Sequence, residues 1–394
     1  MKRLPFFITV FLLITLSACG TESTPSPTDS SSPVIHVVTL TVPPPEAETL
    51  IPETLNQTPI PDEPTPTSEL ISTAVQNLQT PWEIRFLPDG RLLITERPGT
   101  LVLIDADSEP IPIADVREQG ESGLLGLALH PEFDQNRLLY IYLTYQGAGS
   151  LLNRVERYQF DGRVLSDRLV IIDQIPGAAN HDGGRIEFGP DGLLYITTGD
   201  AGYGANAQDI NSLAGKILRL HDDGTFPADN PFGNAVYSYG HRNPQGLAWD
   251  EQGQLWSTEH GPSGFGSGYD ELNLIEIGGN YGWPDIQGDQ TREGMISPRL
   301  HSGGNETWAP GDLEIVDGVA YFTGLRGSTL YSVPLNDIRP ETLERHFASE
   351  YGRLRALRLG PDGLLYVGTS NRDGRGSIRE GDDKIFRIDP KQLR

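Results

Sequence analysis

The chain has 394 residues, a formal net charge of −24 and a single cysteine. So acidic a chain argues against nucleic-acid binding, because phosphate contacts draw on clustered Lys and Arg. One cysteine excludes a disulfide within the chain, so the fold must be held by packing. Net acidity fits a soluble extracellular protein or one that binds calcium, and it does not choose between the two.

The N-terminus has the pattern of an export signal. Lys2 and Arg3 precede an apolar run at residues 4–16, and small residues follow before Cys19. The run is shorter than the roughly 20 residues that cross a bilayer. Residues 16–19, Leu-Ser-Ala-Cys, also resemble the bacterial lipobox, in which the cysteine is lipidated and becomes the mature N-terminus. The alternative is an ordinary secretory signal with an incidental cysteine.

We therefore expect residues 1–18 to be a lipoprotein signal peptide and Cys19 to carry the lipid. The protein would be exported and anchored at the outer face of a bacterial membrane, in the periplasm or at the cell surface. Residues 19–70 are dense in Thr, Ser, Pro and Glu, so they cannot bury enough apolar surface to fold and are expected to form a disordered tether. Residues 71–394 are long enough for one large domain.

A Pro-Asp-Gly turn between apolar residues recurs along that domain. It occurs within residues 86–94, 188–196 and 359–367, and less regular copies lie at 129–141, 249–256 and 315–322. Proline presets the turn and glycine supplies the positive φ, so each copy predicts a tight hairpin between two strands. Six hairpins at about 53 residues per unit predict an all-β fold, a six-bladed β-propeller with four-stranded blades.

An irregular β-sandwich is the alternative to the propeller. In a propeller, residues near 69–75 would supply the outer strand that closes the ring. The phase of the repeat also predicts a site. If each Pro-Asp-Gly turn lies at one rim, the residues before the first strand and after the second lie together at the opposite rim. Polar, glycine-rich segments recur at that phase and contain Glu121, His181, Asp200, Arg242, Asn243, Gly261, Pro262, Trp308, Arg353 and Arg355.

This rim contains a candidate general base and a carboxylate that could support it. His181 lies in a glycine-rich loop, where a neutral imidazole could accept a proton. Asp200 could hold the ring in the productive tautomer. Taken alone, a loop histidine is more often a structural hydrogen-bonding residue and Asp200 a turn residue, so both interpretations stay open at this point.

Other rim residues suggest anion and metal binding. Arginine forks suit a ligand with several carboxylates, although each could instead pair with surface acids; the candidates are Arg242, Arg326, Arg353 and Arg355. Calcium takes oxygen ligands, including backbone carbonyls. The segment that offers them contains Gly261, Pro262, Asp270, Glu271 and Tyr281, and its spacing is not that of an EF-hand.

The motifs taken together resemble the soluble glucose/sorbosone dehydrogenases, quinoproteins that use pyrroloquinoline quinone (PQQ). The resemblance covers about residues 75–390, in order. Its motifs are Gly-Glu-Ser-Gly-Leu-Leu-Gly at 120–126, His-Asp-Gly-Gly-Arg at 181–185, Gly-His-Arg-Asn-Pro-Gln-Gly at 240–246, Glu-His-Gly-Pro at 259–262, Asp-Glu-Leu-Asn at 270–273, Gly-Asn-Tyr-Gly-Trp-Pro at 279–284 and Gly-Arg-Leu-Arg at 352–355.

The resemblance implies a six-bladed propeller that oxidises an aldose at the C1 hydroxyl to a lactone and passes electrons to an external acceptor. His181 would be the base, Asp200 its supporting carboxylate, and Arg242 the residue that polarises the quinone. The other cofactor contacts would be Glu121, Asn243, Trp308, Arg326, Arg353 and Arg355. Gly261 and Pro262 would hold the calcium that bridges to PQQ, and Glu271 and Tyr281 fall where the family can bind a second, structural calcium. Asp270 is a further candidate metal residue, and the insert at residues 263–269 leaves its register in the calcium loop open.

The chain departs from the family's glucose enzyme at three of these positions. Glu121, Asn180 and Arg326 stand where that enzyme has Gln, Asp and Lys. The compact loops resemble the aldose dehydrogenase branch more than the dimeric glucose enzyme, so we expect a monomer. Two other functions remain as alternatives, a calcium-dependent lactonase or esterase and a non-catalytic binding propeller. The first would place carboxylates and Asn around a central ion, and the second would lack the base or the Gly-Pro carbonyls.

Overall fold

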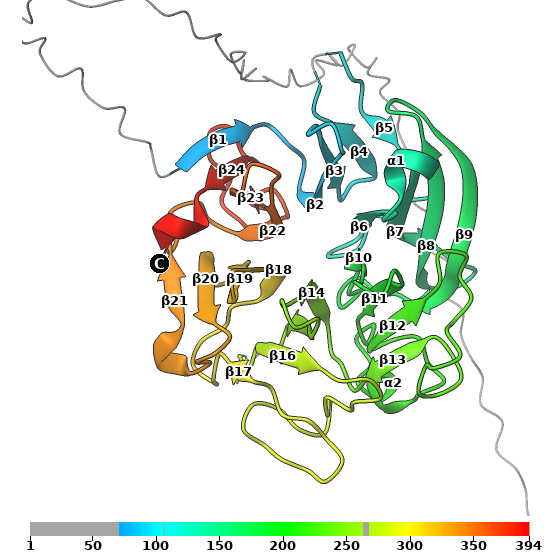
Figure 1. Cartoon of the computed structure of the whole chain (residues 1–394). Helices are drawn as coiled ribbons and strands as arrows, with labels where there is room; N and C mark the ends of the chain where they lie inside the picture. The colour runs from blue at the N-terminus through cyan, green and yellow to red at the C-terminus, as the bar shows by residue number, and fades with distance from the viewer. Residues whose placement is uncertain (1–70, 106, 263–267, 394) are drawn as a thin grey trace, which may run out of the picture. The chain divides into compact units, whose positions relative to one another are not determined.

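The computed structural model describes residues 71–105, 107–262 and 268–393, so the expected signal peptide, Cys19 and the tether lie outside the described residues. In these residues 24 strands form six four-stranded antiparallel sheets. The sheets are arranged around a central axis (Figure 1), which confirms the six-bladed propeller. No helix of the described part is long and apolar enough to cross a membrane.

Each blade runs outward from an inner strand beside the axis. Blade 1 contains β2 (Pro81–Phe86), β3 (Leu92–Glu96), β4 (Thr100–Leu103) and β5 (Ile111–Pro112). Blade 2 contains β6 (Leu124–Leu129), β7 (Leu138–Gln146), β8 (Leu151–Phe160) and β9 (Leu165–Pro176). Blade 3 contains β10 (Ile186–Phe188), β11 (Leu194–Thr198), β12 (Lys216–Leu220) and β13 (Val236–Tyr239).

The other three blades repeat this order. Blade 4 contains β14 (Pro244–Trp249), β15 (Leu255–Glu259), β16 (Glu271–Ile275) and β17 (Leu300–His301). Blade 5 contains β18 (Pro310–Val316), β19 (Val319–Gly324), β20 (Thr329–Pro334) and β21 (Glu344–His346). Blade 6 contains β22 (Leu354–Leu359), β23 (Leu365–Thr369), β24 (Ile385–Ile388) and β1 (Ile71–Val75).

The outer strand of blade 6 comes from the start of the domain. Strand β1 pairs antiparallel with β24, with Ile71 opposite Ile388 and Thr73 opposite Phe386. This confirms the expected ring closure: blade 6 combines a strand from the start of the domain with three from its end, so the ring is closed by β-sheet hydrogen bonds.

The Pro-Asp-Gly segments are the predicted hairpin turns between the first two strands of a blade. Between β10 and β11, the backbone N–H of Gly189 donates to Leu193 at 2.9 Å. Gly192 has a φ of +75°, which glycine adopts without strain. Asp191 braces the turn by accepting from the N–H of Leu193 at 3.1 Å. Each turn thereby places the opposite ends of its two strands at the other rim.

Helices are short in this fold. Among the described residues, α1 (Phe133–Asn136) fills the longer turn of blade 2, and α2 (Ala205–Gln208) lies in the loop after β11. Two 3-10 turns cover Pro340–Thr342 and Pro390–Leu393. The loop that contains α2 is held by Lys216, which is buried and whose Nζ donates to the carbonyls of Asn206, Ala207 and Ala214 at 2.7–3.0 Å.

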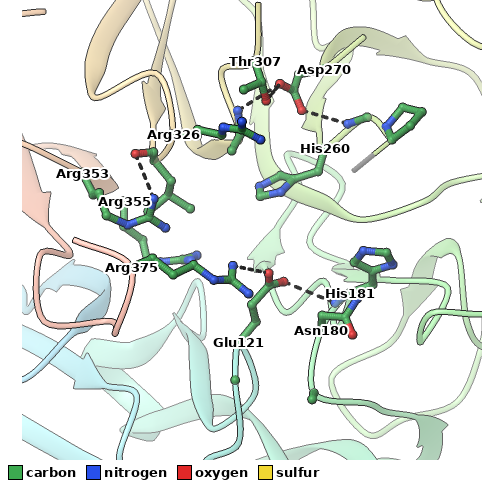
Figure 2. A pocket seen from close by; sticks show the side chains of 16 residues that line it. Glu121, Asn180, His181, His260, Asp270, Thr307, Arg326, Arg353, Arg355 and Arg375 are labelled. Atoms are coloured by element: carbon green, nitrogen blue, oxygen red, sulfur yellow. Dashed lines mark hydrogen bonds and ion pairs between the residues drawn. The ribbon is translucent and has the colours of Figure 1, made fainter. Parts of the chain in front are cut away.

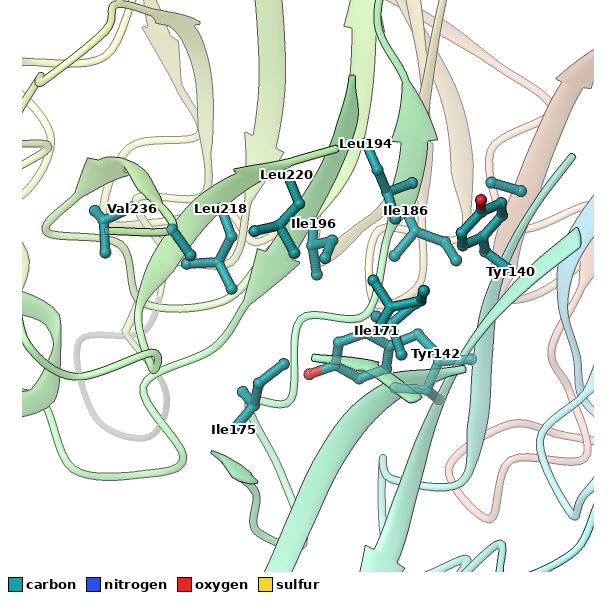
Figure 3. Close-up of a cluster of buried hydrophobic side chains, with 14 of the residues drawn as sticks. Tyr140, Tyr142, Ile171, Ile175, Ile186, Leu194, Ile196, Leu218, Leu220 and Val236 are labelled. Atoms are coloured by element: carbon teal, nitrogen blue, oxygen red, sulfur yellow. The ribbon is translucent and has the colours of Figure 1, made fainter. Parts of the chain in front are cut away.

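Apolar side chains pack between neighbouring blades. Figure 3 shows such a cluster between blades 2 and 3, where Tyr140 and Tyr142 of β7 pack toward Ile186, Ile196 and Leu218. All five are fully buried, and burial of that kind stabilises a fold by about 1.5–3 kcal/mol per large side chain. The blades are therefore joined by apolar packing along their faces.

Charged side chains join the inner strands near the axis. Arg85 of β2 lies 2.6 Å from Glu187 of β10, and Arg358 of β22 lies 3.0 Å from Glu314 of β18. Arg185, fully buried, lies 3.2 Å from Asp312 and also pairs with Glu83. We call these seven residues the axial network. It ties four blades together with charges that are largely removed from water.

Candidate active site

A cavity of about 750 Å³ opens at the rim opposite the Pro-Asp-Gly turns. Its wall is built from the loops that precede inner strands and those that follow second strands, as the repeat phase predicts. Figure 2 shows its polar lining, with acids and bases from five blades facing one space. The polar lining residues are Glu121, Asn180, His181, His260, Asp270, Thr307, Arg326, Arg353, Arg355 and Arg375.

His181 and Asp200 form the predicted pair. The Nδ1 of His181 lies 2.7 Å from Oδ1 of Asp200, whose other oxygen accepts from the indole N–H of Trp283 at 2.8 Å. Burial opposes ionisation of Asp200, but its bonds to His181, Trp283 and Gly202 lower its pKa below the usual value. An ionised Asp200 only accepts, so Nδ1 carries the ring proton and Nε2 is left as a proton acceptor.

The backbone at His181 packs closely against Gly199, the residue that follows β11. His181 has a φ of +62°. A Cβ on Gly199 would stand 1.9 Å from the carbonyl oxygen of His181, so only glycine fits at that position. The same carbonyl accepts from the N–H of Ala201 at 3.2 Å. The loop before β10 and the loop after β11 are therefore one packed unit that fixes the imidazole.

Arg242 and Asn243 precede β14 and lie behind the cavity lining. Their loop is anchored by Glu259, which accepts from the Arg242 N–H and lies 2.9 Å from Nδ1 of His241. The guanidinium of Arg242 lies over Trp283, 5.3 Å from the ring, and burial lowers its pKa. The side-chain oxygen of Asn243 accepts from the N–H of Gly183 at 2.9 Å, which joins this loop to the His181 loop.

Three predicted arginines line the cavity. Arg326 is exposed, whereas Arg353 is held by a two-pronged contact of Nε and Nη2 with Asp373, both at 2.7 Å. Arg355 is 3% exposed, and its Nη1 donates to Gln245 at 2.9 Å. Burial, together with the positive charge of Arg97, lowers the pKa of Arg355 to about 9. This wall of the cavity therefore carries a cluster of guanidinium groups.

Glu121 and Arg375 form an ion pair at the same cavity. Nη1 of Arg375 lies 2.6 Å from Oε1 of Glu121, and the other carboxylate oxygen accepts from the N–H of His181 at 3.3 Å. Burial would raise the pKa of Glu121, but the His260 ring and the Arg375 guanidinium more than offset this and lower it. Burial lowers the pKa of His260 to about 4, so near pH 7 the effective cation is Arg375.

The expected calcium segment is braced by Asp270. Its Oδ1 accepts from the N–H of Gly261 at 2.9 Å, and its Oδ2 accepts from the hydroxyl of Thr307 at 2.7 Å and from the N–H of Trp308 at 2.6 Å. Both oxygens are thus used within the protein. Asp270 therefore braces the turn that contains Gly261 and Pro262.

The other two candidates for calcium make none of the hydrogen bonds of this brace. Glu271 lies opposite Glu259 in the β15–β16 ladder, and burial, with Glu259 nearby, raises its pKa to about 8. The phenol of Tyr281 donates to the carbonyl of Leu274 at 2.6 Å and stacks on His241. Tyr281 could therefore offer a metal its carbonyl but not its side chain. In the described ranges, no three His, Cys, Asp or Glu side chains are grouped to hold a metal ion.

Trp308 differs from its predicted role. Its indole is 1% exposed and packs among Phe322 and Tyr331 in the core of blade 5, with ring centroids 5.2 and 5.6 Å away. The neighbouring Thr307 and Ala309 line the cavity instead. The expectation that Trp308 walls the pocket is corrected: it contributes its backbone N–H, through Asp270, and not its ring.

Sequence reasoning also missed residues that line the cavity. His260, Thr307 and Arg375 were not among the candidates, although all three lie at the predicted repeat phase. Arg375 follows the second strand of blade 6, just as Asp200 follows that of blade 3. Applying the same rule to the end of β23 would have pointed to the segment that contains it.

Comparison with known proteins agrees with this geometry. A sequence model of the glucose/sorbosone dehydrogenase family matches residues 78–379. The aldose sugar dehydrogenase of Escherichia coli K12 is 32% identical over 348 residues, covering 78% of this chain and 92% of that protein. The PQQ-bound aldose sugar dehydrogenase of Streptomyces coelicolor is 36% identical, with a TM-score of 0.73 over 82% of this chain and 97% of that one.

A third similar structure is an oxidoreductase of Thermus thermophilus described as a glucose dehydrogenase. It is 46% identical, with a TM-score of 0.75 over 81% of this chain and 99% of that one. The match in each case spans about four-fifths of this chain and more than nine-tenths of the similar protein.

Proposed function

The chain belongs to the glucose/sorbosone dehydrogenase family, and we propose that it oxidises aldose sugars at the C1 hydroxyl to lactones with PQQ and calcium. The observation that carries the proposal is the arrangement of one cavity, in which a histidine with an acceptor nitrogen faces a wall of arginines. Sugar oxidation needs a base for the hydroxyl proton, and an anionic redox cofactor needs cations to hold it.

The residues present fit PQQ, a planar quinone with three carboxylates. Arg326, Arg353 and Arg355 supply guanidinium groups on one wall of the cavity. Two buried donors, Nε of Arg355 and Nδ2 of Asn243, have no hydrogen-bond partner within the described residues. Buried donors without partners are costly, and an anionic ligand in the cavity would satisfy that of Arg355, which lines it.

His181 would accept the proton of the C1 hydroxyl at Nε2. Asp200 would stabilise the imidazolium that forms, and its bond to Trp283 keeps the carboxylate from rotating. When bound, PQQ would supply the two-electron acceptor, taking the hydride that leaves C1 of the sugar. Arg242, fixed through Glu259, would stabilise the negative charge that develops as this transfer proceeds.

Calcium would be held by the carbonyls of Gly261 and Pro262. Asp270 orients this turn through the N–H of Gly261, and calcium prefers oxygen donors of this kind. A bound cation there would add to the positive field of Arg242. A second calcium at Glu271 and the carbonyl of Tyr281 belongs to the same proposal.

The remaining parts of the proposal concern the protein's setting. A signal peptide at residues 1–18 and a lipid on Cys19 would tether the propeller, through residues 19–70, to the outer face of a bacterial membrane. There the enzyme would act as a monomer and pass electrons to an external acceptor. The pairing of β1 with β24 supports a domain that begins at residue 71.

Reconstitution tests the proposal. Metal-free apoprotein is mixed with PQQ, calcium and an electron-accepting dye, and a panel of aldoses is screened for dye reduction. We expect turnover that requires both PQQ and calcium. His181→Ala should lower kcat by about 10²- to 10⁴-fold, the usual contribution of a general base, while a PQQ titration followed by absorbance is unchanged.

His221→Ala is the matched control, because this histidine lies in a turn on the opposite rim, where its backbone closes the loop with Thr225. Its turnover should equal that of the unmodified protein. No dye reduction with any aldose would refute the proposal, as would a His181→Ala variant with normal turnover.

A further inference from the structure

The rim loop of blade 6 brings a cation into the cavity, against Glu121. This loop, residues 370–383, follows β23, and Arg375 at its tip contacts Glu121 from the loop that precedes β6 of blade 2. The two residues are 254 positions apart and come from blades that are not neighbours. Figure 2 shows the guanidinium and the carboxylate side by side within the cavity, next to His181.

The loop holds Arg375 in place through its backbone. The N–H of Arg375 donates to Oδ1 of Asp373 at 2.9 Å, while Oδ2 of Asp373 is held by Arg353. The Asp373 side chain is 3% exposed, but the Arg375 side chain is 56% exposed. The base of the loop is therefore fixed, and the guanidinium faces the open space of the cavity.

Glu121 places this pair beside the reacting group. The N–H of Glu121 donates to Ala179 at 2.8 Å, and its carboxylate accepts from the N–H of His181. A sugar whose C1 hydroxyl meets Nε2 of His181 would thus have its nearby hydroxyls within the space that Glu121 and Arg375 face. A sugar hydroxyl both donates and accepts hydrogen bonds, so it could bond to the carboxylate of Glu121 or to the guanidinium of Arg375.

The ion pair also differs in kind from a neutral amide. A glutamine at position 121 would donate and accept on its own and would need no counter-ion. A carboxylate only accepts, and when buried it requires a cation. In this chain the donor is therefore supplied separately, by Arg375, so the pair recognises two adjacent hydroxyls with opposite hydrogen-bond roles.

We propose that Arg375 is a specificity-determining residue, which donates a hydrogen bond to one hydroxyl of the aldose while Glu121 accepts from the adjacent one. This inference rests on the proposed oxidation of aldoses and deepens it. The substrate class is a neutral aldose with vicinal hydroxyls next to the oxidised carbon.

The inference is tested by comparing protein variants on a parent sugar and on its deoxy derivatives, as in a double-mutant cycle. The PQQ- and calcium-loaded enzyme is assayed with an aldohexose and its monodeoxy derivatives, in the unmodified form and as R375Q, E121Q and the double variant. In the unmodified enzyme, one deoxy position should raise KM by about tenfold, as expected for a hydrogen bond to a charged group. R375Q should raise KM for the parent sugar by about tenfold and abolish the penalty at that position, and it should also lower kcat, because Glu121 is left without its counter-ion.

Two further variants, R375K and R339Q, sharpen the test together with the double variant. R375K retains the counter-ion without the planar fork, so it should restore kcat but not the discrimination between parent and deoxy sugars. The double variant should recover part of the kcat that R375Q loses, because no uncompensated carboxylate remains. R339Q, which breaks an exposed ion pair with Asp337, should behave as the unmodified enzyme does.

The outcomes separate this inference from the function on which it rests. If the unmodified holoenzyme oxidises no aldose, both fail. If it does, but R375Q lowers kcat equally for all sugars with the deoxy penalty intact, Arg375 only positions Glu121 and the inference is wrong. A roughly tenfold weaker absorbance titration of PQQ into apo R375Q would assign Arg375 to the cofactor and would also overturn it.

Discussion

The buried guanidinium of Arg355 is a group whose charge a bound anion would compensate. Its guanidinium is buried, its Nε has no hydrogen-bond partner in the described part of the chain, and Arg97 and Arg353 add positive charge around it. Burying charge without full compensation destabilises the fold. A bound carboxylate would relieve that cost, so the stability of the protein should depend strongly on the cofactor.

This predicts opposite effects of Arg355→Leu on the free and the loaded protein. The variant apoprotein should melt at a temperature equal to or above that of the unmodified apoprotein, because a buried cation is removed. The rise in melting temperature on adding PQQ should be much smaller, and the Kd for PQQ should increase more than tenfold. Thermal melts with and without PQQ measure both. An unchanged Kd would show that Arg355 does not bind the cofactor.

Among single residues, the sequence predicted positions best for residue types that have few structural roles. His181 and Asp200 were paired from repeat phase and chemistry, and the structure brings them to 2.7 Å. Trp308 was misplaced because an indole serves equally well in a core and in a pocket wall, and only packing against Phe322 decides between them. Arg375 was missed because its loop contains no recognisable motif.

At the scale of elements, Asp270 joins the loop after β15 to the loop before β18. One carboxylate accepts from Gly261 on one side and from Thr307, Trp308 and Ala309 on the other. The geometry of the Gly261–Pro262 carbonyls therefore depends on Asp270, whose two carboxylate oxygens already accept hydrogen bonds within the protein.

Asp270→Asn should weaken calcium binding without removing any carbonyl ligand. The amide can no longer accept at both ends, so the unfolding free energy should fall by about 2–4 kcal/mol. Isothermal titration of calcium into the apoprotein should give a Kd raised at least tenfold. Asp337→Asn, at an exposed pair, serves as the control. If Asp270→Asn binds calcium normally, the brace is not required for that site.

The elements themselves were the most predictable part of the fold. A Pro-Asp-Gly turn is local chemistry, and each clear copy forms the expected hairpin, as at Gly192. The pairing of β1 with β24 follows from the need to close a ring. The helical turn α2 and the buried Lys216 could not be foreseen, because they depend on contacts between loops that no period in the sequence encodes.

At the scale of the whole molecule, the axial network couples the blades to pH. Burial raises the pKa of Asp312 to about 8, and burial also raises the pKa values of Glu187 and Glu314. A carboxyl whose pKa is higher in the folded state binds more protons there than in the unfolded chain. Its contribution to stability is therefore fully present below its unfolded pKa, near 4, and is lost as the pH rises through the folded pKa of about 8.

We expect the melting temperature of the apoprotein to fall between pH 5 and pH 8. Asp312→Asn should reduce that slope, because the amide cannot ionise yet can still accept from the N–H of Leu357. Asp107→Asn, at an exposed carboxylate, should leave the slope unchanged. Calorimetry across this range provides the test, and a melting temperature that rises toward pH 8 would contradict the assignment.

The central claim is that one cavity joins a sugar base to a PQQ site. The most direct measurement mixes calcium-loaded, PQQ-reconstituted protein with one equivalent of aldose, without oxygen or dye, and follows the cofactor's absorbance. We expect the absorbance of the oxidised cofactor to be lost in a single turnover, with one lactone formed per site. In His181→Ala this loss should be slower by about 10²-fold or more. Bound PQQ whose absorbance stays unchanged with every aldose would contradict it.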